Sequence, residues 1–357
     1  METRPVMRVV AFMVVLVVAP GCRTTSPEDA VAAGSVRIDQ LAANPRVVEP
    51  ATRVVEFRYR TSEPVSSRLI VLDPLEAPVA ELDAAPSADV VEVAWQPSAL
   101  LNGVYTFRVE TLTPDGWRIA TKPPSPRREV LAQRFQFDRE PPQARFILPE
   151  PAFVVLRVGT ASVPLLRTLM DWKPLPPGSH QVRWDGLDSS GAIRVGLRED
   201  LRLGLRAYSL PDTYLIAQGF ERTPDPGSSS SLRPTNLPCM AIAKIASACQ
   251  EPQFDVRFVG AESSDSLLPR VRDYAIVRVS LGAADRAVLL RARFEVMFFV
   301  DTVFLFEEEQ ATDPLNYTLD VSDLPPGEHL LTVNVLGYDD RVAVRSVPFV
   351  VAPREAS

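Results

Sequence analysis

Prolines divide this chain into short apolar runs, and that punctuation limits the folds open to it. The sequence holds 34 prolines against 16 glycines. Because proline lacks the N–H that a helix interior or a central sheet ladder needs, it gathers in turns, sheet edges and linkers. Between prolines, Val55, Phe57 and Tyr59 alternate with charged residues, which is the period-two pattern of a half-buried strand. Many such runs, with turn residues roughly every ten positions, predict an all-β chain.

Two proline-rich seams divide the body of the chain into blocks. They lie at Arg139 to Gln143 and at Thr223 to Pro238, and the second also carries a run of serines typical of an exposed linker. The predicted parts are a β-sandwich over 36–138, a second over 144–222, a linker over 223–253 and a third sandwich over 254–352. The stretch from Ala283 to Val296 also allows a helix, but its alternation and its position among strands favour a strand.

One short pattern, Leu-x-x-Gly-x-aromatic, recurs near the penultimate strand of each block. Its glycines and rings are Gly103 with Tyr105, Gly178 with His180, and Gly327 with His329. We expect the glycine to supply backbone angles that other residues resist. We expect the ring to pack over the turn and to bond its own backbone, as a tyrosine corner does. Both histidines are therefore predicted to be structural, since two single histidines in separate modules do not build a histidine-rich metal site.

The first residues have the three parts of an export signal. Arg4 and Arg8 give a positive start, Val9 to Val18 is a short apolar core, and Ala19 to Gly21 ends it before Cys22. The apolar run is shorter than a mature helix needs to cross a hydrocarbon layer of about 30 Å. It fits a signal peptide over residues 1–21.

The cysteine after a small residue resembles the lipobox of bacterial lipoproteins. The resemblance implies cleavage after Gly21, fatty acyl chains such as palmitate on Cys22, and a polar tether over 22–35. Ala19 stands where the family usually has Leu, and an ordinary secretory signal that contains a cysteine is the alternative. Arg23 is not the Asp that keeps some lipoproteins at the inner membrane, which favours the outer membrane by resemblance.

Two of the three cysteines, Cys239 and Cys249, remain as a pair once Cys22 carries lipid. An oxidising compartment favours a disulfide between them. The alanine-rich segment between them also allows a helix, and a straight helix would hold them about 15 Å apart, too far to bridge. The bond therefore requires a loop or a broken helix, which Pro238 and Pro252 allow.

Each block resembles a known immunoglobulin-like (Ig-like) or fibronectin-like family. Residues 144–222 resemble the Ig-like domain of the bacterial flagellar hook-capping protein, at Gly178, Trp184, Asp185, Gly186, Asp188 and Gly191. Residues 254–352 are similar to bacterial Ig-like modules of surface proteins and carbohydrate-active enzymes, at Val300, Asp301, Tyr317 and Leu324 to His329. Residues 36–138 resemble a fibronectin- or Ig-like domain at Trp95, Gly103 to Tyr105, Asp115 and Gly116. These resemblances imply a fold and export, and a flagellar role would rest on analogy alone.

The turn from Trp184 to Gly191 is the strongest candidate in the sequence for a binding site. Asp185, Asp188 and the serines beside them offer oxygens to Ca²⁺, but the spacing does not match a calcium loop with its distal Glu. Asp and Ser in such turns more often bond their own backbone, so no metal is predicted. The acidic run Phe306 to Gln310 is predicted to be a solvated strand end. No nucleophile elbow, phosphate loop or zinc-protease motif occurs, so no catalytic residue and no cofactor are predicted.

These observations predict an all-β, lipid-anchored protein of the cell envelope that binds or organises other envelope or secreted proteins and is not an enzyme. The net charge of −7 argues against a nucleic-acid partner. A glycan-binding protein is the first alternative, and it predicts a row of exposed aromatics among Trp95, Trp117, Trp172 and Trp184. A hydrolase with an unrecognised acidic pair is the second, and it predicts two carboxylates close together in a pocket.

Overall fold

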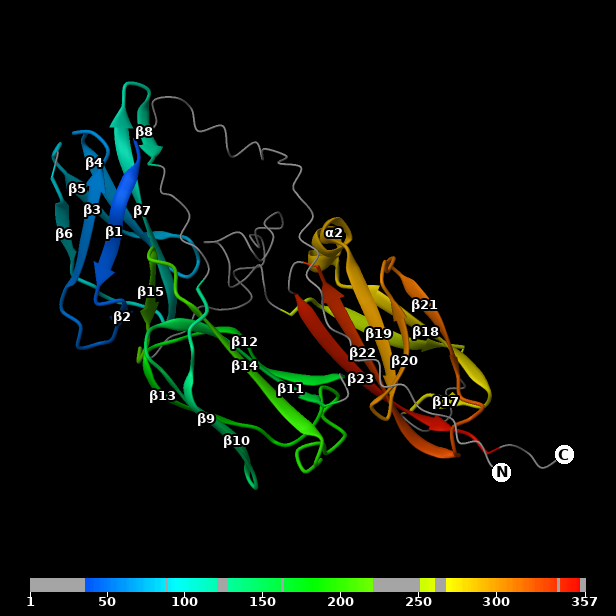
Figure 1. Ribbon diagram of the computed structural model, residues 1–357. Helices are drawn as coiled ribbons and strands as arrows, with labels where there is room; N and C mark the ends of the chain where they lie inside the picture. The colour runs from blue at the N-terminus through cyan, green and yellow to red at the C-terminus, as the bar shows by residue number, and fades with distance from the viewer. Residues whose placement is uncertain are drawn as a thin grey trace, which may run out of the picture. The chain divides into compact units, whose positions relative to one another are not determined.

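The computed structural model describes residues 36–87, 89–120, 128–161, 164–220, 251–260, 268–338 and 341–353. Within these ranges the chain is almost entirely β, and the predicted all-β sandwich fold is confirmed (Figure 1). The strands form sheets that pack face to face in three sandwiches around clusters of buried apolar side chains.

The first sandwich packs a small sheet on a larger one. The small sheet has the order β1 (Ile38–Asn44), β3 (Val55–Thr61), β6 (Val91–Trp95). The larger has the order β2 (Val47–Val48), β15 (Tyr214–Ala217), β7 (Gly103–Thr113), β4 (Ser67–Leu72), β5 (Pro78–Ala84), and β8 (Gly116–Ile119) pairs with β7. The alternating residues Val55, Phe57 and Tyr59 all point into the core, as the sequence pattern predicts.

The second sandwich consists of two three-stranded sheets. One has the order β13 (Gly178–Arg183), β10 (Pro142–Leu148), β9 (Gln133–Arg139). The other has the order β12 (Leu165–Leu175), β11 (Ala152–Thr160), β14 (Leu201–Ser209). Phe146 and Leu148 of β10 pack with Val154 of β11 in one buried cluster, which holds the two sheets together.

The third sandwich is built around one continuous cluster of buried apolar residues. Its smaller sheet has the order β16 (Phe254–Val259), β18 (Tyr274–Leu281), β21 (Leu315–Asp320). Its larger sheet has the order β17 (Arg270–Val271), β23 (Val342–Val351), β22 (Gly327–Gly337), β19 (Phe294–Val300), β20 (Val303–Glu308). Phe298 and Phe349 of the larger sheet are fully buried in this core.

A helix, α2 (Ala283–Ala292), connects the two sheets of the third sandwich, so the prediction of a strand over this stretch was wrong. Asp285, Val288 and Leu289 are its buried residues, at the i, i+3, i+4 spacing of one helix face. The Asp285 carboxylate accepts the Gln253 backbone N–H at 2.9 Å, which fixes the start of the helix. The strand begins only at Phe294, because Arg293 leaves the helical conformation with φ of 65°.

Two strands pair outside the blocks in which the sequence places them. β9 lies in the predicted first block but pairs with β10, because the proline-rich seam after it is a tight hairpin and not a boundary between blocks. β15 lies within the predicted second block but pairs with β7 of the first sandwich, from Tyr214 opposite Thr106 to Ala217 opposite Gly103. In Figure 1, β15 lies beside β2 and β7. The chain therefore enters the second sandwich at β9 and returns to the first at β15.

Candidate functional site: a polar turn, three corners and an exposed edge

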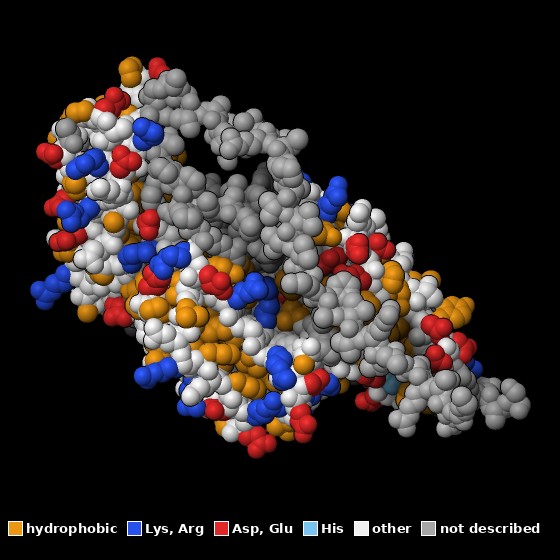
Figure 2. Space-filling view, in the orientation of Figure 1, with side chains coloured by type: hydrophobic (Ala, Val, Ile, Leu, Met, Phe, Trp, Pro, Cys, Tyr) orange, Lys and Arg blue, Asp and Glu red, His pale blue; other side chains and the backbone are white. Residues whose placement is uncertain are grey.

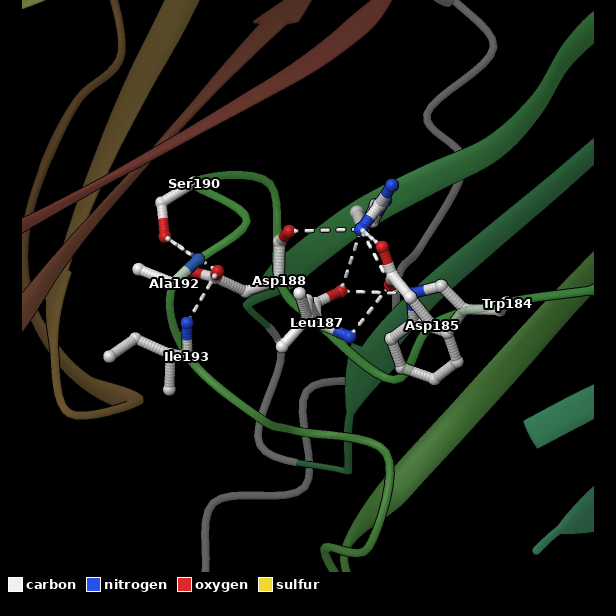
Figure 3. A network of polar contacts seen from close by, with 8 residues as sticks. Trp184, Asp185, Leu187, Asp188, Ser190, Ala192 and Ile193 are labelled. Atoms are coloured by element: carbon white, nitrogen blue, oxygen red, sulfur yellow. Dashed lines mark hydrogen bonds and ion pairs between the residues drawn. The ribbon is translucent and has the colours of Figure 1, made fainter. Parts of the chain in front are cut away.

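The turn after β13 gathers most of the polar residues that the sequence singles out (Figure 3). Asp185 Oδ1 accepts the Leu187 backbone N–H at 2.9 Å, and Trp184 Nε1 donates to the Leu187 carbonyl at 2.8 Å. Arg167 of β12 donates to Asp185 Oδ1 at 2.9 Å. Gly186 and Gly191 carry the positive φ angles, 77° and 73°, that let the chain reverse here.

Asp188 lies at the centre of this turn and is fully buried. Its Oδ1 accepts the Ser190 hydroxyl at 2.6 Å and the Ile193 N–H at 3.3 Å, while Ser190 Oγ accepts the Ala192 N–H at 3.1 Å. Its Oδ2 has no hydrogen-bond partner in the described part of the chain. The described residues contain no group of three or more His, Cys, Asp or Glu that could hold a metal ion. The arrangement is that of side chains capping their own loop.

The three corner motifs have one geometry. Their glycines have φ of 151°, 118° and 140° at Gly103, Gly178 and Gly327. Each ring contacts the backbone of the residue four positions before it. Tyr105 Oη accepts the Leu101 N–H at 2.9 Å, and the Nε2 atoms of His180 and His329 lie 2.9 and 2.7 Å from the Pro176 and Pro325 carbonyls. A phenol and two imidazoles thus perform the same structural task.

His329 makes a further contact that the other two rings lack. Its Nδ1 lies 2.6 Å from Asp301 Oδ2, and Asp301 Oδ1 accepts the Leu330 N–H at 3.0 Å. Burial disfavours the protonated ring, but the Pro325 carbonyl and the Asp301 carboxylate outweigh it and raise the pKa of His329 above its ordinary value. Both ring nitrogens are engaged in holding the corner to the Asp301 turn, so the role of this histidine is structural.

Two partly buried carboxyl groups, those of Asp171 and Glu251, lie where the second and third sandwiches touch. Asp171 Oδ2 accepts the Glu251 N–H at 2.5 Å, and Glu251 Oε1 accepts the Val344 N–H at 2.9 Å. Burial raises the pKa of both carboxyl groups, against the opposing effects of these hydrogen bonds and of Arg157. The Asp171 carboxylate thus binds a backbone amide across the contact, and the Glu251 carboxylate binds one within the third sandwich. Through these two bonds the chain at Glu251 links β12 to β23, and one oxygen of each carboxyl group is engaged with the backbone.

The tryptophans do not form the exposed row that glycan binding predicts. Trp95, Trp172 and Trp184 are buried, and only Trp117 is substantially exposed, at 39%. The Arg68 guanidinium lies 4.4 Å from the centre of its ring. On the face shown in Figure 2, basic and acidic side chains are mixed, and no continuous basic surface is in view.

Several sequence predictions fall outside the described residues. Gly21, Cys22, Cys239 and Cys249 lie there, so cleavage, lipidation and the disulfide remain predictions. Among the described residues, no helix is long and apolar enough to cross a bilayer.

The sequence reading missed one surface, on β20. Val303, Phe304, Leu305 and Phe306 are consecutive and apolar, yet each is between 37% and 64% exposed. We call these four residues the β20 edge surface. From the acidic run Phe306 to Gln310, the sequence predicts only a solvated strand end here. An apolar run usually predicts burial, so only the position of β20 at the margin of its sheet reveals the exposure.

No protein-family model and no curated protein matches the chain. Among solved structures it is similar to the central fibronectin-III array of RIM-binding protein, at 12% identity over 90% of this chain and 98% of that one, with a TM-score of 0.20. It is also similar to a bacterial ice-binding adhesin, at 10% identity over 89% of this chain and 98% of that one, with a TM-score of 0.20. Trypsin-activated alpha-2-macroglobulin from Escherichia coli matches at 11% identity over 90% of this chain, with a TM-score of 0.24.

The chain spans 24% of the length of that alpha-2-macroglobulin and 20% of the length of a matching endo-beta-1,4-mannanase from Thermotoga petrophila. At these TM-scores we infer nothing about the function of this chain from the similarities. The fold class rests on the strands and their pairing alone.

Proposed function

We propose that this chain is a lipid-anchored protein of the bacterial cell envelope that acts as a non-enzymatic binding scaffold through its tandem Ig-like sandwiches. Its partners are envelope or secreted proteins, and Cys22 carries the anchor, with the outer membrane as its site. The lipobox resemblance supports the anchor. One structural observation carries the scaffold role, and it is the way in which β15 joins the first two sandwiches.

β15 is buried on both of its faces. Leu215 and Ala217 lie in the core of the first sandwich. Tyr214 and Ile216 lie on the other face and pack with Phe153 and other residues of the second sandwich. A strand whose two faces belong to two cores leaves little room for a hinge between them, because both cores would lose apolar contact if it moved.

Polar contacts reinforce this junction and extend it to the third sandwich. Arg46 Nη2 donates to the Leu210 carbonyl at 2.6 Å, just before β15. Asn334 of β22 makes two bonds to the Leu165 backbone of β12, donating from Nδ2 at 3.0 Å and accepting at Oδ1 at 2.9 Å. The Asn334 amide thus satisfies both backbone groups of Leu165, as the backbone of a neighbouring strand would. Fixed bodies with exposed loops and edges are suited to holding partners in position.

Membrane fractionation and crosslinking in intact envelopes test the proposal. Wild-type protein and the matched control Cys249→Ser should incorporate labelled palmitate and sediment with membranes, whereas Cys22→Ser should do neither. A crosslinked protein neighbour should recur with the wild-type protein and decline with Cys22→Ser. Palmitate incorporation by Cys22→Ser would contradict the anchor, and enrichment of glycans without a protein neighbour would replace the scaffold role with glycan binding.

A further inference from the structure

The β20 edge surface lies on the outermost strand of a sheet. In the described chain β20 pairs only with β19, so its second edge faces no other strand. Natural edge strands are usually short, charged or covered, because a free apolar edge attracts other chains. Four consecutive exposed apolar residues on such an edge therefore need an explanation.

The two phenylalanines of this surface are held in place by rings beneath them. Phe306 stacks on Tyr317, with ring centroids 5.1 Å apart and ring planes 7° apart. Phe304 packs edge-on against the buried Phe299 at 5.7 Å. Because these ring contacts already restrict the two side chains, the side chains lose little conformational entropy when a partner binds. Such pre-ordered rings are typical of the residues that contribute most to binding at an interface.

The apolar residues end in a group of negative charges. Glu307, Glu308 and Glu309 follow directly, and Glu295 of β19 lies beside them. None of these four carboxylates makes an ion pair within the described ranges. Burial, together with the charges of Glu307 and Glu309, raises the pKa of Glu295, as expected for carboxylates that repel one another. Tyr338, which is exposed, donates its hydroxyl to the Glu309 carbonyl at 3.3 Å and adds an aromatic ring to this end.

The same features disfavour a second copy of this chain as the occupant. A second β20 strand contains no basic residue to pair with the acidic end of the first. The register with β19 also shifts at Leu305, which lies between the pairs Phe298–Phe306 and Phe299–Phe304 as an extra residue. Such a bulge limits regular pairing to the residues on either side of it for any strand added along β20. A partner that carries basic residues supplies the opposite charge that a second β20 strand lacks.

We propose that the β20 edge surface and the carboxylates beside it bind an extended segment of another protein, one that carries aliphatic or aromatic side chains next to Arg or Lys. The apolar side chains of that segment pack on Phe304 and Phe306, and its basic residues pair with Glu307 and Glu308. The inference rests on the proposed binding role and names the chemistry of one partner. Attachment along a sheet edge is a common way in which β domains take up peptides.

A fluorescence anisotropy titration tests this with the full chain in detergent micelles. The probe is a labelled, end-capped synthetic peptide reading Lys-Arg-Lys-Thr-Val-Thr-Phe-Thr-Val, and a control peptide has Glu in place of its three basic residues. We expect saturable binding of the basic peptide that weakens as salt rises. The acidic peptide should bind at least about tenfold more weakly than the basic one. Absence of saturable binding of the basic peptide, or equal binding of both, would overturn the proposal.

Variants distinguish binding at the β20 edge surface from non-specific binding to exposed apolar side chains. Phe304→Ser should weaken binding about tenfold, whereas Phe135→Ser, which removes a similarly exposed ring from β9, should not change it. Glu307→Lys with Glu308→Lys leaves the apolar core untouched and should reverse the preference towards the acidic peptide. Unchanged binding in both β20 variants would refute the site. Dimerisation that Phe304→Ser abolishes would assign the surface to a second copy instead.

The outcome is distinct from that of the crosslinking test. If the basic peptide does not bind while envelope crosslinking still yields a protein neighbour, only this surface is rejected and the scaffold role stands.

Discussion

The corner glycines give the sharpest test of how this sequence determines its fold, and the second sandwich offers a matched pair of positions. Gly178 begins β13 with φ of 118°, and Gly204 lies within β14 without a positive φ. A Cβ added at either position meets no atom within 4 Å. Substitution by alanine therefore adds the same methyl group to equally open space, and only the backbone conformation differs.

The expected magnitudes follow from this comparison. Alanine restricts the unfolded chain in both variants, which by itself stabilises the folded state by about 0.4–1 kcal/mol. At Gly204 nothing opposes this gain, so Gly204→Ala should be neutral or slightly stabilising. At Gly178 an alanine must adopt a sparsely populated backbone conformation, at a cost of about 1–3 kcal/mol. Because the effect on the unfolded state cancels, the difference between the two variants measures the strain of the corner.

Native-state hydrogen exchange followed by mass spectrometry measures this locally. The peptide that covers β13 should exchange roughly tenfold faster or more in Gly178→Ala than in Gly204→Ala, since 1.4 kcal/mol corresponds to a factor of ten. Urea unfolding of the same variants, followed by tryptophan fluorescence, gives the global value. Equal exchange in the two variants would refute the argument that the corner requires glycine.

Three further changes test the polar contacts. Tyr105→Phe should lower the free energy of unfolding by about 1 kcal/mol, as measured by urea unfolding, because the N–H that its hydroxyl accepts loses its partner. The raised pKa of His329 means that its contribution to stability is complete below the unfolded pKa of about 6.5 and is lost as pH rises through the higher folded pKa. Urea midpoints should therefore fall over that interval in the wild-type protein and not in His329→Gln. Asp188→Ala should cost about 1–3 kcal/mol in urea unfolding, and added Ca²⁺ should leave the melting temperature of the wild-type protein unchanged; a rise would favour a calcium site.

Local patterns were sufficient for much of the fold. The alternation of Val55, Phe57 and Tyr59 fixes which face of β3 is buried, because the side-chain period of a strand is two. The corners are determined locally, since the glycine and the ring lie within six residues of chain and the ring contacts the backbone of the residue four positions before it. Asp185 and Asp188 cap their turn for the same local reason.

Errors arose where a local pattern allows two structures. The stretch before β19 contains apolar residues at both strand and helix spacing, and the buried set Asp285, Val288 and Leu289 shows which spacing prevails. Gly282 directly precedes the helix, and the helical spacing of Asp285, Val288 and Leu289 can be seen in the sequence. The proline pair between β9 and β10 fits a boundary between domains as well as a hairpin, and nothing nearby in the sequence distinguishes the two.

Other features depend on contacts far apart in the chain and have no local signal. β15 is a short apolar run whose partner, β7, precedes it by about a hundred residues, and such pairing depends on tertiary packing. The β20 edge surface is apolar in composition, and its exposure follows only from the order of strands in the sheet. The same holds for Asp171 of β12 and Glu251 near the end of the predicted linker, which come together only in the folded chain.

The placement of β15 in the first sandwich is the claim on which the scaffold role most depends, and an engineered disulfide tests it directly. Val104 and Ile216 are directly opposite residues of β7 and β15 and pack in one cluster. In a chain with Cys22, Cys239 and Cys249 replaced by serine, Val104→Cys with Ile216→Cys should form a disulfide under mild oxidation, seen as loss of free thiol in the folded monomer. Persistence of both free thiols in the folded, oxidised protein would contradict the shared strand and the scaffold built on it.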